Sequence, residues 1–188
     1  YDAPWKDMEA QGWIAPAECT EVRVTMTDNE RMLYATAEPD ERYRLCSTVH
    51  TKIAVVKSIL ERHPGDQTLV IGAYLDQLDE LGEELNAPVI QGSTKTAERE
   101  ALFDAFRRGE VSTLVVSKVA NFSIDLPEAN VAVQVSGTFG SRQEEAQRLG
   151  RLLRPKADGG GAIFYSVVSR DSLDAEYAAH RQRFLAEQ

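Results

Sequence analysis

The chain has 188 residues, of which 43% are hydrophobic, 27% charged and 7% aromatic, and its mean hydropathy is -0.35. This length and composition predict one globular domain with a full hydrophobic core, which excludes a disulfide-rich miniprotein and a repeat array. No apolar run approaches the roughly 18 residues of a membrane helix, and no leader sequence is recognisable, so we expect neither membrane insertion nor secretion. The net charge of -9 argues against broad, charge-driven binding of nucleic acid.

The cysteines and histidines form no spacing that is typical of a disulfide framework or a zinc site. Cys19 and Cys46 are far apart in the sequence, and the three histidines are scattered. We therefore expect reduced thiols, an intracellular protein and no metal ligated by this chain alone. Because the sequence begins at Tyr1 and not at a methionine, we interpret the chain as a piece of a longer protein.

The first part of the chain predicts a connector and a small helical insertion. Glu21–Met26 alternates apolar and polar residues as an edge strand does, and Asp28–Ala37 and Glu41–Glu61 have the pattern of charged helices. We divide the chain into a connector with an edge strand at 1–27, a thumb-like helical insertion at 28–50 and an α/β domain at 51–188.

Short apolar runs and helical stretches alternate through the rest of the chain. The predicted buried strands are Thr68–Ile71, Pro88–Ile90, Thr113–Val116, Val131–Val135 and Ala162–Val168. The predicted helices are Tyr74–Leu85, Thr96–Arg108, Ser141–Arg154 and Asp171–Ala186. This alternation predicts the α/β class, with a parallel sheet that helices cover on both faces.

Small and hydroxyl-bearing residues follow four of these strands. In an open α/β sheet, ligands bind beyond the carboxyl ends of the strands, because helix N-termini and free backbone amides converge there. Such residues allow an extended phosphate backbone to approach, although they are also common in turns and N-caps. The four segments are Gly72-Ala73-Tyr74, Gln91-Gly92-Ser93-Thr94, Ser117-Lys118 and Ser136-Gly137-Thr138.

The helix predicted at Ser141–Arg154 concentrates positive charge. Residues 141–156 hold five cations and two carboxylates, which makes this the most favourable place for an anion. At about 100° per residue, Gln147, Arg151 and Arg154 share one polar stripe, which lies opposite the apolar stripe, whereas Arg148 lies off it. An arginine stripe suits a phosphate ligand, but a solvated helix face explains the pattern equally well.

Four sequence motifs between Leu69 and Arg154 resemble those of superfamily 2 helicases. Gln147-Arg-Leu-Gly-Arg-Leu-Leu-Arg154 resembles motif VI of their second RecA-like domain, and Ser117–Ala129 resembles motif V. Leu69–Leu78 occupies the place of motif IV, and Gln91-Gly-Ser-Thr94 resembles motif IVa. The details of motifs V and VI are similar to those of XPB-type helicases, and the resemblance covers essentially the whole chain.

The resemblance implies a role for several residues. Arg151 and Arg154 match arginine fingers that reach the terminal phosphate of ATP on the first motor domain, and Gln147 matches a residue near that phosphate and the attacking water. Asp125 matches a motif V carboxylate near the nucleotide or its arginine partner. The positions that match or adjoin contacts to the DNA backbone are Gly72, Tyr74, Gly92, Ser93, Ser117 and Lys118. Motif V departs from the family pattern at Ala120–Phe122, to which we assign no contact.

The chain has no phosphate-binding loop of the form G-x-x-x-x-G-K-[ST] and no Asp-Glu pair that follows a strand. We therefore expect ATP and Mg²⁺ to be held mainly by an N-terminal motor domain of the same protein, and this fragment alone to be inactive. The whole protein is expected to be an ATP-dependent DNA helicase or translocase. The alternatives are another superfamily 2 translocase, of restriction or remodelling type, and a non-catalytic α/β module that binds a partner protein.

The resemblance also suggests a cellular setting. XPB-type proteins act in nucleotide excision repair or transcription, so the expected partners are DNA, the N-terminal motor domain and repair nucleases or transcription proteins, with no membrane. The chain has 15 arginines and 6 lysines, a bias that favours a bacterial source and a cytoplasmic location over a nuclear one.

Overall fold

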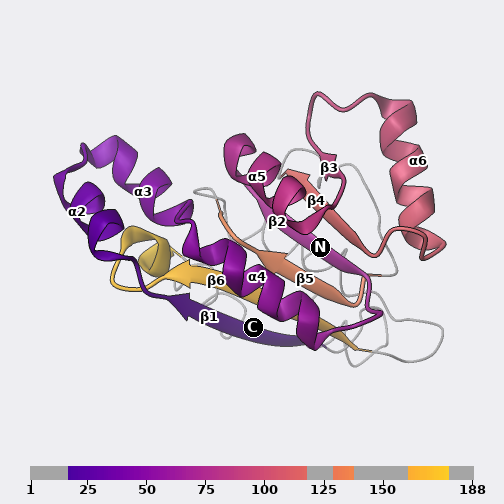
Figure 1. Ribbon diagram of the computed structural model, residues 1–188, viewed down its shortest axis with the longest axis horizontal. Coiled ribbons are helices and arrows are strands. Elements are labelled where there is room, and N and C mark those ends of the chain that lie inside the picture. The colour runs from indigo at the N-terminus through magenta and orange to yellow at the C-terminus, as the bar shows by residue number, and fades with distance from the viewer. Residues whose placement is uncertain (1–16, 118–128, 138–160, 178–188) are drawn as a thin grey trace, which may run out of the picture.

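The computed structural model of the chain describes residues 17–117, 129–137 and 161–177 (Figure 1). Six strands in these ranges form one sheet in the order β1-β6-β5-β2-β4-β3, and every neighbouring pair is parallel. The strands are β1 Ala17–Val24, β2 Thr68–Gly72, β3 Val89–Ile90, β4 Thr113–Ser117, β5 Val131–Gln134 and β6 Ala162–Ser169. The predicted parallel α/β sheet is therefore confirmed.

Five helices are described in full. They are α2 Asp28–Thr36, α3 Pro39–Ser47, α4 Thr51–Arg62, α5 Leu75–Leu85 and α6 Thr96–Arg107. Figure 1 shows α4 running across the side of the sheet formed by β1, β6 and β5, while α2 and α3 project beyond the carboxyl ends of β1 and β6. A short helical segment at 173–177 follows β6.

The central strands β2, β4 and β5 are buried on both faces because their apolar side chains alternate between two cores. Leu69 and Ile71 of β2 pack into one core with Phe103 and Phe106 of α6. Val70 of β2 points the other way, into a core that α3, α4 and α5 share. A parallel sheet covered in this way needs continuous apolar strands, and that is why the short apolar runs predicted them correctly.

The predicted insertion forms two helices with clear start signals. Thr27 and Glu30 form a reciprocal capping box at the start of α2, and α3 begins with Pro39 in its first turn. The single helix predicted at Glu41–Glu61 is wrong, because α3 ends at Ser47 and α4 starts at Thr51.

The interruption between α3 and α4 has a local cause. The backbone N–H and the hydroxyl of Thr48 both donate to the Arg44 carbonyl, which closes the last turn of α3, and Val49 turns into the core. Residues 47–51 contain no proline or glycine that would mark the break, so periodicity alone missed it.

β1 is an edge strand, as predicted, because it pairs with β6 alone among the described strands. It begins at Ala17, four residues before the predicted start. The helix predicted at Ser141–Arg154 lies outside the described residues. No helix within the described ranges is long and apolar enough to cross a membrane.

Candidate nucleic-acid interface at the carboxyl ends of the strands

Four strand ends that the sequence singled out lie side by side along one edge of the sheet. In the parallel register, Gly72 of β2 is opposite Ser117 of β4, and the Val135 N–H after β5 donates to the Ile71 carbonyl at 2.9 Å. β3 lies beside β4 at the edge of the sheet, and Gln91 comes directly after β3 in the chain. The order along the edge is therefore Ser136, Gly72, Ser117 and Gln91, and we call this row, together with Gly92 and Ser93 in the turn after Gln91, the strand-end rim.

The members of the strand-end rim differ in accessibility. Gly92 and Ser93 are exposed in the turn after β3, where they are open to a ligand. Ser117 is buried, with only 2% of its surface exposed. A phosphate contact by the Ser117 hydroxyl therefore stays a prediction that requires the rim to open locally.

Gly72 has a packing reason to be glycine. A Cβ at this position would lie 2.8 Å from Leu78 Cδ2 and 3.0 Å from Ser136 Oγ. The missing side chain lets α5 and the end of β5 approach the end of β2. Because Gly72 is buried by this packing, its predicted DNA contact is not required to explain the residue.

Tyr74 sits at the start of α5, between the rim and the helical insertion. The Arg44 guanidinium from α3 lies 5.8 Å from the centre of the Tyr74 ring, and Arg44 pairs with Asp76 at 2.6 Å. Partial burial is the main cause that raises the pKa of Tyr74 to about 12, so its hydroxyl stays protonated at neutral pH. The hydrogen bond from Arg44 lowers the pKa of Asp76.

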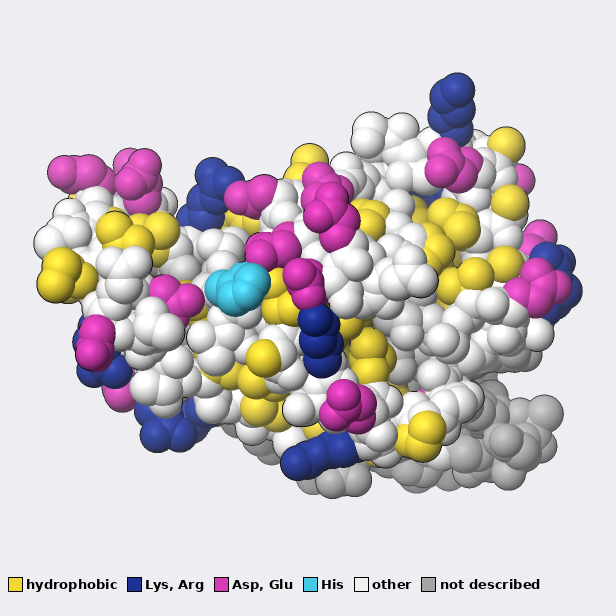
Figure 2. All heavy atoms as spheres, in the orientation of Figure 1, with side chains coloured by type: hydrophobic (Ala, Val, Ile, Leu, Met, Phe, Trp, Pro, Cys, Tyr) yellow, Lys and Arg dark blue, Asp and Glu magenta, His cyan; other side chains and the backbone are white. Residues whose placement is uncertain are grey.

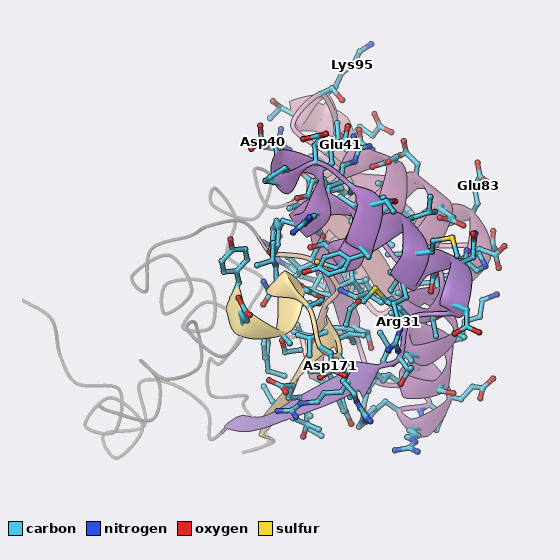
Figure 3. All side chains as sticks on the ribbon, turned by 90° about the vertical axis from the view of Figure 1, so that its left-hand side faces the viewer. Arg31, Asp40, Glu41, Glu83, Lys95 and Asp171 are labelled. Carbon is cyan, nitrogen blue, oxygen red and sulfur yellow. The ribbon has the colours of Figure 1, made fainter. Side chains whose placement is uncertain are left out.

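The charge around the rim is mixed. Figure 2 shows acidic side chains gathered over α5, so this helix face repels a phosphate backbone. Lys95, before α6, extends away from the body of the domain, whereas Asp40 and Glu41 lie at the first turn of α3 (Figure 3). Within the described residues, an anionic ligand is therefore favoured near Gly92 and Lys95 over the exposed face of α5.

A buried polar network lies beneath this rim, and sequence reasoning missed it. Lys52 Nζ lies 2.6 Å from Asp174 Oδ2 and donates to the Val135 carbonyl at 2.6 Å, and both side chains are 1% exposed. The signal for Lys52 is its position on the apolar stripe of α4, four residues before the buried Val56. Nothing local marks Asp174, because its partner is 122 positions away.

Five residues predicted to act at the ATP site or on DNA lie outside the described residues. They are Gln147, Arg151, Arg154, Asp125 and Lys118. Their roles stay predictions. Among the described residues, no three His, Cys, Asp or Glu side chains gather in a way that could hold a metal ion.

The sheet order and the parallel strands define a RecA-like fold, as predicted. The fold is similar to that of the Pyrococcus furiosus Hef helicase domain, with a TM-score of 0.53 at 20% identity over 69% of this chain and 27% of that one. At this identity the likeness concerns the fold alone.

The sequence assigns the domain to a particular protein family. The model of the family described as ERCC3/RAD25/XPB C-terminal helicase matches residues 8–188, so the chain belongs to this family. Membership selects the XPB type among the superfamily 2 alternatives, and it confirms the resemblance that the motifs carry.

Two relatives illustrate the range of the family. The chain is 90% identical over its full length to a protein of Mycobacterium tuberculosis named DNA 3'-5' helicase XPB, covering 34% of that protein. It is 37% identical, again over its full length, to the Drosophila melanogaster general transcription and DNA repair factor IIH helicase/translocase subunit XPB, covering 24%. The chain thus spans about a quarter to about a third of the length of these relatives.

Proposed function

We propose that this chain is the C-terminal motor domain of an ATP-dependent DNA helicase or translocase of XPB type. The observation that carries the proposal is the family membership of residues 8–188, together with the row of strand ends that the fold aligns on one edge. The chemistry of phosphoryl transfer depends on positioning and charge neutralisation, so it is easily divided between two domains.

In this proposal the ATP site is shared. The N-terminal motor domain of the same protein holds ATP and Mg²⁺, and this domain supplies Arg151 and Arg154 to the terminal phosphate, with Gln147 near the attacking water and Asp125 near the nucleotide. Charged donors that arrive only when the two domains close couple hydrolysis to motion.

The strand-end rim is the proposed DNA-binding edge. Gly92 and Ser93 are its exposed members, Tyr74 borders it, and Gly72, Ser117 and Lys118 complete the predicted set. The acidic cover of α5 supports a path for DNA along the rim and away from that helix face. The insertion at 28–50 holds more acidic than basic residues, so we assign no electrostatic grip on DNA to it.

The proposed biological role is DNA repair or transcription. The name of the Drosophila relative supports both, and partners in such complexes would be repair nucleases or transcription proteins. The close bacterial relative supports the expected bacterial source and a cytoplasmic location.

A comparison of ATP turnover tests the proposal. The full-length protein should hydrolyse ATP and do so faster with DNA, whereas residues 1–188 alone should show no turnover and bind ATP poorly, because their sequence has no phosphate-binding loop. Turnover by the isolated chain that is lost in Arg151→Ala would contradict the shared site. Absence of DNA-stimulated turnover in the full-length protein would overturn the proposed activity.

A further inference from the structure

Three consecutive residues that follow β5 are each held by a buried side chain from a different helix. Lys52 of α4 donates from Nζ to the Val135 carbonyl at 2.6 Å, and Tyr43 of α3 donates from its hydroxyl to the Gly137 carbonyl at 2.5 Å. Between them, the Ser136 hydroxyl donates to Gln77 Oε1 of α5 at 2.7 Å. We call Tyr43, Lys52 and Gln77 the β5 clamp.

Each member of the β5 clamp is itself held in place. Lys52 is paired with Asp174 at 2.6 Å, and Gln77 Nε2 donates to the Ser47 carbonyl at 2.9 Å. The Tyr43 ring meets the edge of the Tyr177 ring, with the ring centres 4.7 Å apart. The three side chains are 1–6% exposed, so water cannot replace their hydrogen bonds.

The clamp also connects the end of β5 with its neighbour in the sheet. The Ala73 N–H, directly after β2, donates to Ser136 Oγ at 2.8 Å. One serine hydroxyl therefore joins the ends of β2 and β5, and a movement of α3 that displaces Tyr43 or Ser47 reaches both.

Volume filling does not account for this arrangement. Apolar side chains would fill the same space without the cost of burying an ammonium group and a carboxylate. Hydrogen bonds to three successive residues fix the position and direction of the chain, which packing alone leaves adjustable. The clamp holds the chain where it leaves the sheet, and the sequence then runs on to Gln147, Arg151 and Arg154.

We infer that the β5 clamp fixes Val135–Gly137, the point from which the sequence continues toward the predicted arginine fingers, and that the Tyr43 hydroxyl couples the α2–α3 pair to this point. The inference rests on the proposed function. Tyr43, Lys52 and Gln77 are positioning residues in this scheme, because Tyr43 and Lys52 act through the backbone carbonyls of Gly137 and Val135 and Gln77 acts through the Ser136 hydroxyl.

Tyr43→Phe in the full-length protein is the direct test, because it removes one hydroxyl and keeps the packed ring. The turnover number for ATP at saturating DNA should fall at least about tenfold, since misplacing a catalytic group by about 1 Å can cost up to 10²-fold. The KM for ATP should stay within about twofold, because ATP is held by the other motor domain.

Tyr34→Phe is the matched control. Tyr34 is on α2 of the same helical pair, and its hydroxyl accepts a hydrogen bond from the Leu173 N–H at 3.1 Å, away from Val135–Gly137. Both variants lose one hydroxyl and keep the ring, and Tyr43→Phe should lower the melting temperature at least as much because its hydroxyl is the more buried of the two. Only Tyr43→Phe should lose DNA-stimulated turnover.

The outcomes separate the inference from the proposed function. DNA-stimulated turnover in the wild type with equal turnover in Tyr43→Phe and Tyr34→Phe overturns the positioning role alone, whereas a wild type without such turnover overturns both. If Tyr43→Phe does not fold, the double variant Lys52→Met/Asp174→Asn replaces it, because it removes the second clamp contact without leaving a charge unpaired. A folded double variant with wild-type turnover overturns the inference, and a loss of turnover at a near-normal melting temperature supports it.

Discussion

Lys52 and Asp174 form an ion pair that is buried on all sides, with Nζ and Oδ2 2.6 Å apart and both side chains 1% exposed. Asp174 also accepts a hydrogen bond from the Ser169 N–H at 2.9 Å, so the pair joins α4, the end of β6 and the segment after it. When Asp174 is neutralised, the positive charge of Lys52 stays in the core without a compensating negative charge.

We therefore expect Asp174→Asn to lower the free energy of unfolding by about 3–5 kcal/mol. For a domain of this size, that corresponds to a fall in melting temperature of about 6–20 °C. Differential scanning calorimetry of the purified chain measures it. A loss below about 1 kcal/mol would show that the buried charge finds other partners.

The matched control is Asp76→Asn at the exposed pair with Arg44. The separation of this pair is also 2.6 Å, but its side chains are 58% and 60% exposed. Water screens the charges, so the substitution should cost at most about 1 kcal/mol. Because Arg44 lowers the pKa of Asp76, the small stabilisation is present above the usual aspartate pKa and is lost as pH falls through the lowered value. Equal losses in the two variants would mean that burial does not decide the effect.

Gly72→Ala should destabilise the domain by overpacking. The new Cβ would lie 2.8 Å from Leu78 Cδ2 and 3.0 Å from Ser136 Oγ, so either α5 or the end of β5 must shift, at a cost of about 1–3 kcal/mol. Leu78→Val removes the nearest methyl carbon. In urea unfolding, the double variant should therefore lose less than the sum of the single variants. Strict additivity would argue against this contact.

The sequence predicted the strands well and the helix boundaries less well. Buried parallel strands require continuous apolar runs, and Val131–Val135 or Thr113–Val116 can hardly form anything else between two helical stretches. The break between α3 and α4 depends on the hydrogen bonds of Thr48 to a single carbonyl, and a threonine in a charged helix pattern does not predict it.

The candidate site was predictable only in part. Polar residues after strands mark the carboxyl edge, because every parallel strand ends there, but the order of those ends depends on long-range pairing such as that of Gly72 with Ser117. The β5 clamp was not predictable from local patterns. Its contacts join residues that are 59–94 positions apart, and each member is an ordinary residue in its own segment.

The isolated chain should bind single-stranded DNA weakly, and its affinity for DNA should fall steeply as salt is added. The net charge is -9, and the acidic cover of α5 leaves only a local basic field for phosphates. Binding through a few phosphate contacts falls with each released counterion. A fluorescence titration at two salt concentrations measures this dependence. Submicromolar binding that is insensitive to salt would contradict this expectation.

Substitution of the predicted arginine fingers separates catalysis from stability. Arg151→Ala and Arg154→Ala in the full-length protein should leave the domain folded, because the sequence pattern predicts a polar stripe for them opposite the apolar stripe of the helix, and exposed substitutions change stability by less than about 0.5 kcal/mol. Arginine fingers contribute about 10³–10⁵ in rate. DNA-stimulated ATP turnover should therefore fall by orders of magnitude.

Two further variants test whether the effect requires the guanidinium group and whether it requires the predicted position on the helix. Arg151→Lys should fail to restore turnover, because a point charge cannot hold two phosphate oxygens as a planar guanidinium does. Arg148→Ala should cost less, since Arg148 is turned about 100° from Gln147 on the predicted helix. Phosphate release measured with malachite green, alongside melting temperatures, reports all four variants. Near-normal turnover in Arg151→Ala and Arg154→Ala would identify the stripe as solvated surface charge and remove the chemical basis for a shared ATP site.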